Sequence, residues 1–92
     1  MALLTEKEVE AGLKAATGWK KEGAEISKTF IFDGFARSMG FVQSVALLAE
    51  KANHHPDIDI RWNKVTLRLS THSAGGLTSK DFDLAEQINA LG

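Results

Sequence analysis

Residues 57–70 read DIDIRWNKVTLRLS, and this stretch decides the fold. Apolar and polar residues alternate through Asp57–Trp62 and again through Lys64–Thr71, a pattern typical of strands with one buried and one wet face. The two runs meet at Asn63-Lys64, which is short enough for a two-residue turn, and asparagine tolerates the positive φ that such turns need. The stretch therefore predicts an antiparallel hairpin.

The register of this hairpin follows from the position of the turn. With the turn at Asn63-Lys64, Trp62 lies opposite Val65, and Asp59 faces Arg68 in a favourable cross-strand charge pair. A slip of one residue would place isoleucine opposite arginine, so the pattern supports this register. The apolar residues share one face, where we expect Trp62 to pack in the core and anchor the hairpin.

Patterns on both sides of the hairpin predict the remaining elements. Thr5 with Glu8, and later Thr78 with Asp81, have the capping-box spacing that opens a helix. The expected elements are a helix over 5–17, strands over 19–22 and 25–32, a helix over 35–53, the hairpin, and a helix after Thr78. We therefore predict one α+β domain over residues 1–92. It has a four-stranded antiparallel sheet with three helices packed on one face, in the order α-β-β-α-β-β-α.

The composition limits the classes of function. The chain has 92 residues, 43% of them hydrophobic and 25% charged, with a formal net charge of −1. It has no basic cluster to hold a nucleic acid, and no cysteine for disulfides, thiolate metal sites or nucleophilic catalysis. No apolar run approaches the roughly 18 residues of a membrane helix, and the N-terminus has no signal-peptide pattern. We expect a cytoplasmic protein without nucleic-acid or membrane partners.

The helix expected over Phe35–Asn53 has two apolar stripes. One contains Phe35, Met39, Val42, Ala46 and Ala49, and the other contains Phe41, Val45, Leu48 and Ala52. Because one sheet face can cover only one stripe, the second needs another helix or another subunit. We expect a homodimer or homotetramer that assembles through this helix and the sheet edges; cover by the other two helices is the alternative.

The three histidines of the chain converge in this arrangement. NHHPD, residues 53–57, follows the long helix, and His72 follows the hairpin. When the register is extended, His55 falls opposite His72 on the polar face, and His54 at the helix end is within reach. We therefore expect one site that contains all three imidazoles.

Each histidine also has a structural explanation. A histidine at a helix C-terminus interacts favourably with the helix dipole, a half-exposed strand accommodates histidine, and His-His-Pro is a common helix exit. A zinc site is a further alternative, but adjacent strand residues point apart, and no spacing such as HExxH is present. Three converging imidazoles favour general acid–base chemistry, which suits the addition or loss of water.

A wider set of residues resembles the signature of the pterin-4a-carbinolamine dehydratases. The set is Glu50, His54-His55-Pro56, Trp62, His72 and Asp81. The intervals between these residues match those of the family throughout, and the expected order of helices and strands matches as well. The resemblance covers nearly the whole chain.

This resemblance implies a hydro-lyase that needs no cofactor and no metal. The substrate is a 4a-hydroxytetrahydropterin, such as 4a-hydroxytetrahydrobiopterin, released by pterin-dependent aromatic amino acid hydroxylases. Loss of water gives the quinonoid dihydropterin, which a reductase recycles. By resemblance, His54, His55 and His72 are the catalytic residues, and the pterin binds to Asn53-His54-His55 and Ser70-Thr71-His72.

Four further positions have supporting roles or depart from the family. Asn53 replaces the aspartate of the better-known animal members, and an amide can hydrogen-bond the pterin but cannot ionise. Glu50, one helical turn earlier, either supplies a charge or is an ordinary exposed helix residue. Asp81 is expected to be structural, through its capping box, and Pro56 is expected to fix the chain exit that aims His55.

The family also has members with other partners. Animal members bind a homeodomain transcription factor as a dimerisation cofactor, and the sequence gives no support for or against that role here. The alternatives to catalysis are therefore a dimerisation or assembly cofactor that binds a partner helix, or a role in molybdopterin metabolism. The intact histidine trio argues for catalysis, since a scaffold has no physical need of converging imidazoles.

Overall fold

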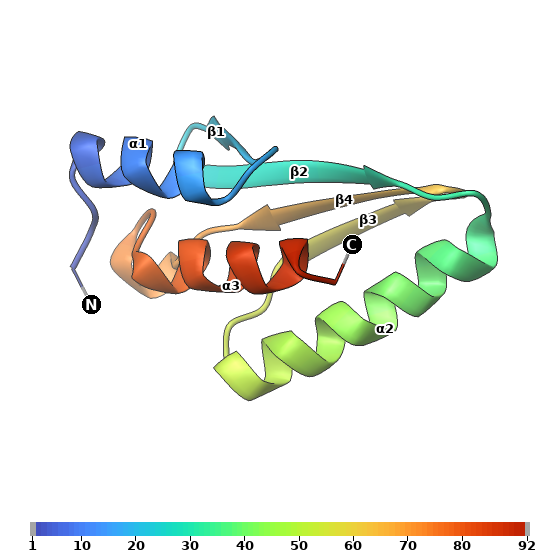
Figure 1. The fold of residues 1–92 in the computed structure, drawn as a ribbon. Helices are drawn as coiled ribbons and strands as arrows, with labels where there is room; N and C mark the ends of the chain where they lie inside the picture. The colour runs from blue at the N-terminus through green and yellow to red at the C-terminus, as the bar shows by residue number, and fades with distance from the viewer. Residues whose placement is uncertain (1, 92) are drawn as a thin grey trace.

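The structure, a computed structural model, describes residues 2–91 and confirms the predicted order of elements. They are α1 (Glu6–Ala15), β1 (Lys20–Glu22), β2 (Glu25–Ile31), α2 (Phe35–Ala52), β3 (Asp57–Arg61), β4 (Lys64–Leu69), the short 3-10 helix η1 (His72–Ala74) and α3 (Ser79–Asn89) (Figure 1). Both predicted capping boxes are present, at the starts of α1 and α3. Within residues 2–91, no helix combines the length and the apolar character needed to cross a membrane.

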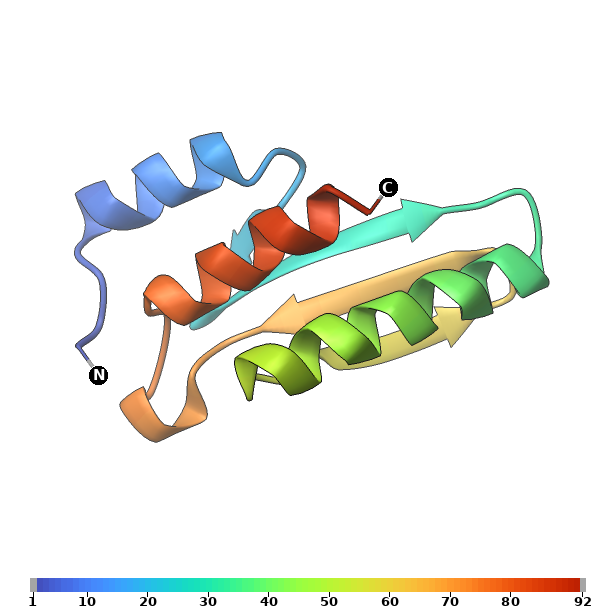
Figure 2. The ribbon, with the colours of Figure 1, turned by 60° about the horizontal axis from the view of Figure 1, so that its bottom comes forward.

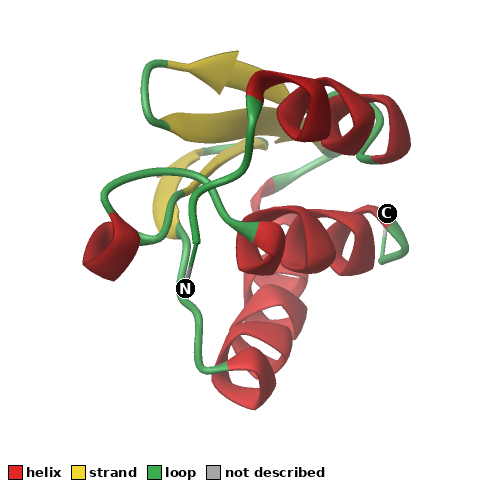
Figure 3. Cartoon of the chain, turned by 90° about the vertical axis from the view of Figure 1, so that its left-hand side faces the viewer, coloured by secondary structure: helices red, strands yellow, loops and turns green. Residues whose placement is uncertain are grey.

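The four strands form one antiparallel sheet in the order β1-β2-β4-β3. The three helices lie on the same side of this sheet, as Figures 2 and 3 show. The predicted α+β fold is therefore confirmed. β1 and β3 are the edge strands, and β4, which leads into the histidine-bearing η1, lies in the centre of the sheet.

Aromatic contacts fix α2 to the sheet. The ring centroid of Phe41 on α2 lies 4.7 Å from that of Phe30 and 5.0 Å from that of Phe32. Such pairs add to the stabilisation that comes from burying apolar area. The same layer contains fully buried side chains from both strands and helices, among them Ile26, Val45, Leu67, Leu69, Leu84 and Ile88.

The two apolar stripes of α2 have different environments. Phe41 and Val45 are buried in the core, whereas Phe35 and Met39 on the other stripe are 54% and 42% exposed. Ile58 on the edge strand β3, which was expected to face inward, is also 40% exposed. The described chain therefore covers Phe41 and Val45 of one stripe and leaves Phe35 and Met39, at the start of the other stripe, open.

The hairpin register differs from the prediction by two residues. Asp57, rather than Asp59, lies opposite Arg68, and the turn residues are Trp62-Asn63. A shift of two residues keeps every side chain on its predicted face, so the alternation alone could not distinguish the two registers. The faces of the paired strand residues were predicted correctly, and the pairing was wrong.

Trp62 is consequently not a core residue, and that prediction is wrong as well. It sits in the turn with a φ of 53° and is 70% exposed. The neighbouring Asn63 is bound to the end of β2: the N–H of Phe32 donates to its carbonyl at 2.8 Å, and its Nδ2 donates to the carbonyl of Phe32 at 3.2 Å. These contacts join segments far apart in the sequence, and they favour a turn one residue earlier than the local pattern predicts.

Candidate active site

The candidate site forms where the end of α2 meets the end of β4. Asn53 ends α2 in the left-handed region, with φ 49° and ψ 44°, which asparagine tolerates better than most residues. The N–H of His54 then donates back to the carbonyl of Ala49 at 3.1 Å. His54 and His55 follow this sharp turn, and their imidazoles have different partners.

An open pocket of about 430 Å³ lies between these segments, and its volume is in the range of small-molecule sites. Its lining consists of Asn53-His54-His55, Ser70-Thr71-His72-Ser73 and Lys80. All six residues that were expected to contact a substrate line this pocket, the three histidines among them. The tertiary structure brings the two predicted segments together, despite the error in the hairpin register.

His54 is held from behind by a buried carboxylate. Its Nε2 lies 2.6 Å from Asp81 Oδ1, and the two side chains are 10% and 0% exposed. The other oxygen of Asp81 accepts from the Thr71 hydroxyl and from the N–H of Thr78, both at 2.9 Å. A carboxylate can only accept, so Nε2–H of His54 donates to Asp81, and in the neutral imidazole this tautomer leaves Nδ1 without a proton.

The free nitrogen of His54 is accessible. Within residues 2–91 no buried side-chain nitrogen or oxygen lacks a hydrogen-bond partner. Nδ1 of His54 has no such partner in the described chain, so it is not fully buried, and the residue lines the pocket. Sequence reasoning assigned Asp81 only to the capping box; the box is present, and the contact with His54 is an additional role that the sequence did not reveal.

His55 has a carboxylate partner too, but on the surface. Its Nε2 lies 2.5 Å from Glu50 Oε2, and the side chains are 56% and 76% exposed. Glu50 is one turn back on α2, as expected from its spacing. Glu50 is an exposed helix residue that also pairs with His55, so a role for its charge at the site stays a prediction.

His72 lines the pocket from the β4–η1 segment. It is the first residue of η1, and its side chain has no hydrogen-bond partner within residues 2–91. The loop around it is tight, because the N–H of Thr71 donates to the carbonyl of Gly76 at 2.8 Å and Gly75 has a φ of 79°. Only glycine adopts such a φ readily, and this turn fixes the position from which His72 faces the pocket.

Other residues were placed differently from expectation or were missed. Trp62 is in the turn at the far end of the hairpin and does not line the pocket, while Pro56 lies between the histidine pair and β3 without lining it. Ser73 and Lys80 do line it and were not predicted. The only signal for them in the sequence is adjacency, since Ser73 follows His72 and Lys80 precedes Asp81.

The donor set of the site contains no preformed metal cluster. Within residues 2–91, no group of three or more His, Cys, Asp or Glu side chains is arranged to hold a metal ion. Two of the three imidazoles point a nitrogen at a carboxylate rather than toward one common point. The arrangement suits proton transfer between the imidazoles and a bound molecule.

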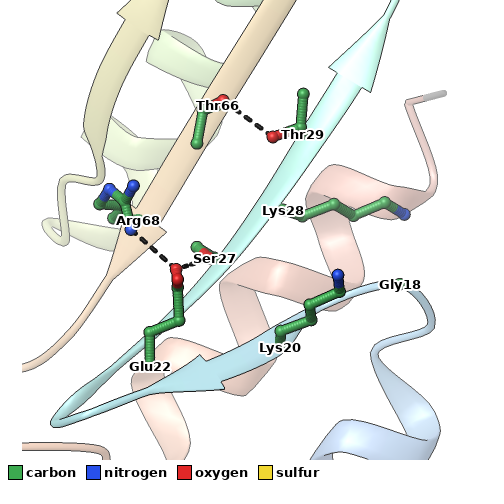
Figure 4. A pocket seen from close by; sticks show the side chains of 8 residues that line it. All are labelled: Gly18, Lys20, Glu22, Ser27, Lys28, Thr29, Thr66 and Arg68. Carbon is green, nitrogen blue, oxygen red and sulfur yellow. Dashed lines mark hydrogen bonds and ion pairs between the residues drawn. The ribbon is translucent and has the colours of Figure 1, made fainter.

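A second hollow of about 370 Å³ lies on the helix-free side of the sheet (Figure 4). Glu22 and Arg68 form an ion pair here: the Ser27 hydroxyl and the Arg68 guanidinium both donate to Glu22 and lower the pKa of that carboxyl. Burial lowers the pKa of Lys28, which donates to the carbonyl of Thr17 and to the side-chain oxygen of Asn89. None of the predicted site residues lies here.

Comparisons with known proteins agree with these observations. The model of the family described as pterin 4 alpha carbinolamine dehydratase matches residues 2–91. A protein of Roseiflexus castenholzii, provisionally named pterin-4-alpha-carbinolamine dehydratase, is 60% identical over 98% of this chain and 97% of its own length. A protein of Acidobacterium capsulatum with the same provisional name is 53% identical over 99% of both chains.

Two solved structures have a similar fold. A transcriptional coactivator/pterin dehydratase from Brucella melitensis is 38% identical, with a TM-score of 0.93 and 97% of each chain covered. A pterin dehydratase-like protein identified as a RuBisCO assembly factor of the alpha-carboxysome is 24% identical, with a TM-score of 0.70 over 84% of this chain and 92% of that one, and shows the fold alone. The family model and the close relatives establish that this chain belongs to the pterin-4a-carbinolamine dehydratase family.

Proposed function

We propose that this protein removes water from a 4a-hydroxytetrahydropterin, such as 4a-hydroxytetrahydrobiopterin, and releases the quinonoid dihydropterin, a step in recycling of the pterin cofactor. The observation that supports the proposal most is the pocket in which His54, His55 and His72 meet beside Asn53, Ser70 and Thr71. The family of the chain gives the chemical class of the substrate. The proposal includes the cytoplasmic location expected from the sequence.

The reaction needs one proton donor and one proton acceptor. The C4a–O bond breaks as the departing hydroxyl takes a proton, N5 loses its proton, and a C4a–N5 double bond forms. Imidazoles perform both transfers near neutral pH, and the carboxylates of Asp81 and Glu50 stabilise an imidazolium formed at His54 or His55. No metal or cofactor is required by this balance of atoms and electrons.

The test is a stopped-flow measurement of carbinolamine dehydration by wild type, His55→Ala and His72→Ala. General acid–base catalysis is worth roughly 10²–10⁴-fold, so each variant should lose about 100-fold or more of the catalysed rate. Lys64→Ala, beside the hairpin turn and outside the pocket, is the matched control and should retain the wild-type rate. A chelator should change nothing. If wild type does not exceed the buffer rate, the protein is not a dehydratase.

A second candidate is a non-catalytic role as a dimerisation or assembly cofactor, or a pterin-binding role in molybdopterin metabolism. The observation that favours a binding role is the open stripe on α2, where Phe35 and Met39 are 54% and 42% exposed. The same stripe supports the expected homodimer or homotetramer, because exposed apolar area of this kind is covered by association. The name of the Brucella melitensis structure combines both activities, so catalysis and association need not exclude each other.

The mass in solution distinguishes these arrangements. Light scattering at micromolar concentration should give a dimer or tetramer for wild type, and Met39→Glu, which places a charge on the open stripe, should shift the protein toward the monomer. Glu86→Gln on the exposed side of α3 is the control. A wild-type monomer would contradict the proposed homo-oligomer and leave the stripe free for a different partner.

A further inference from the structure

Lys80 is a lining residue to which the proposed reaction gives no role. It is the second residue of α3, its side chain is exposed, and it borders the pocket opposite the end of α2. Within residues 2–91 its Nζ forms no ion pair and no hydrogen bond, while the carboxylate next to it in sequence, Asp81, is fully buried against His54. The ammonium group is therefore available to a bound molecule.

The negative and positive charges near the pocket occupy different positions: the carboxylates pair with histidines, and a lysine lines the pocket. Both carboxylates of the site, Asp81 and Glu50, are engaged by histidines, and neither lines the pocket. Apart from the three imidazoles, the other lining side chains are an amide and hydroxyls, from Asn53, Ser70, Thr71 and Ser73. Lys80 is thus the only permanently charged group that lines the pocket among the described residues, and it is a cation.

In the hollow on the other side of the sheet, Arg68 and Lys28 have partners in the chain, which Lys80 lacks. There Arg68 is paired with Glu22, as Figure 4 shows, at 2.8 Å, and it lies 3.6 Å from Glu25. Lys28 donates to the carbonyl of Thr17 and to the side-chain oxygen of Asn89. Lys80 has no comparable partner. A phosphate bound beside it would gain an ion pair and would not have to displace a carboxylate.

We infer that this pocket prefers pterins whose side chain carries a phosphate, and that Lys80 is the residue that determines this preference. The inference rests on the proposed function, because it takes the pterin ring as the group bound by the histidine segments. Lysine binds phosphate as a point charge, and the hydroxyl of Ser73, which also lines the pocket, is a further possible donor to the phosphate oxygens. Lys80 takes no part in the proton transfers.

The experiment compares two ligands with one ring. Dissociation constants are measured by calorimetry for 7,8-dihydroneopterin and for its 3′-phosphate, with wild type, Lys80→Met, Lys80→Arg and the distant control Lys64→Met. An exposed ion pair of this kind corresponds to about a fivefold difference in affinity, and salt should reduce it. We expect the phosphate to bind about five times more tightly to wild type, Lys80→Arg and Lys64→Met, and the ratio to fall to about one in Lys80→Met.

The outcomes test the phosphate preference, the assignment to Lys80 and the proposed function separately. Equal affinity of wild type for the two ligands overturns the phosphate preference and leaves the pterin site intact. A preference that persists in Lys80→Met also overturns the assignment, since another group must then hold the phosphate. If neither ligand binds wild type, the proposed function fails, and the inference fails with it.

Discussion

Two histidine–carboxylate pairs flank the pocket, and they differ in burial far more than in geometry. His54–Asp81 is 2.6 Å long with side chains 10% and 0% exposed, whereas His55–Glu50 is 2.5 Å long with side chains 56% and 76% exposed. A charge that loses its partner in the interior remains unsolvated, while one at the surface returns to water. Similar contacts should therefore contribute very differently to stability, and both should matter to catalysis.

The largest expected effect is the loss of the buried carboxylate. Asp81→Ala should lower the free energy of unfolding by about 3–5 kcal/mol, because it removes the partner of His54 and of the Thr71 hydroxyl together with the α3 capping box. Urea denaturation measures this change. Asp83→Ala, an exposed position on the same helix, is the control and should change stability by less than about 0.5 kcal/mol.

Asp81→Asn separates shape from charge in the buried pair. It should retain more stability than Asp81→Ala, yet lose most of the dehydration rate, because an amide can donate to Nε2 of His54 and so favour the other tautomer. The rate and the denaturation midpoint are measured on the same sample. Full activity in Asp81→Asn would show that the charge of Asp81 does not act through His54.

Thr71→Val removes the hydroxyl that donates to Asp81 and keeps the volume of the side chain nearly constant. The Thr71 hydroxyl is 2.9 Å from Asp81 Oδ2 and 2.8 Å from the Thr78 hydroxyl, and its loss should cost about 1.5–3 kcal/mol. Thr66→Val removes a similar hydroxyl contact on the open face of the sheet and should cost much less. Equal losses in the two variants would mean that burial does not decide the strength of these contacts.

Glu50→Gln should affect the dehydration rate but barely affect stability, unlike the changes expected at Asp81. Because the pair with His55 is exposed, the variant should change the free energy of unfolding by less than about 1 kcal/mol, while the dehydration rate falls by about tenfold through the loss of charge beside His55. Glu86→Gln is the matched helix control. A large loss of stability with unchanged rate would contradict the proposed role of Glu50.

The smallest expected effect concerns Glu22, an exposed carboxylate remote from the pocket. The Ser27 hydroxyl and then Arg68 lower its pKa below the usual 4.5, so its contribution to stability is present above pH 4.5 and is lost as the pH falls through the folded-state pKa. Glu22→Gln should therefore flatten the acid side of the curve of Tm against pH. Glu10→Gln should leave that curve unchanged, and identical curves for Glu22→Gln and wild type would contradict the assignment.

Local pattern was sufficient for the fold and for the faces of the sheet. Capping boxes at Thr5 and Thr78 begin helices as predicted, because a cap uses only residues three apart. The alternation over 57–70 placed the paired strand residues on the correct face, although the register was shifted by two and Trp62 lies in the turn. The three histidines were expected together from the elements that carry them, whereas Asn53, Ser70 and Thr71 were expected from the resemblance to the family; all six line the pocket.

Contacts between segments far apart in the sequence could not be predicted from the local pattern of residues. Trp62 is apolar and fits a strand, yet the bonds between Asn63 and Phe32 place it in the turn. The role of Asp81 was hidden for a similar reason, because its capping box already explained its presence in the sequence. The contact with His54 joins positions 27 residues apart.

The sequence by itself determined the order of elements, the alternating faces and the segments that carry the imidazoles, because each depends on neighbours within a turn of helix or two positions of a strand. Only the tertiary structure decided which carboxylate holds which histidine, and that Lys80 borders their pocket. Those facts depend on how α2, β4 and α3 pack against one another. Packing depends on the whole core, which no short stretch of residues specifies.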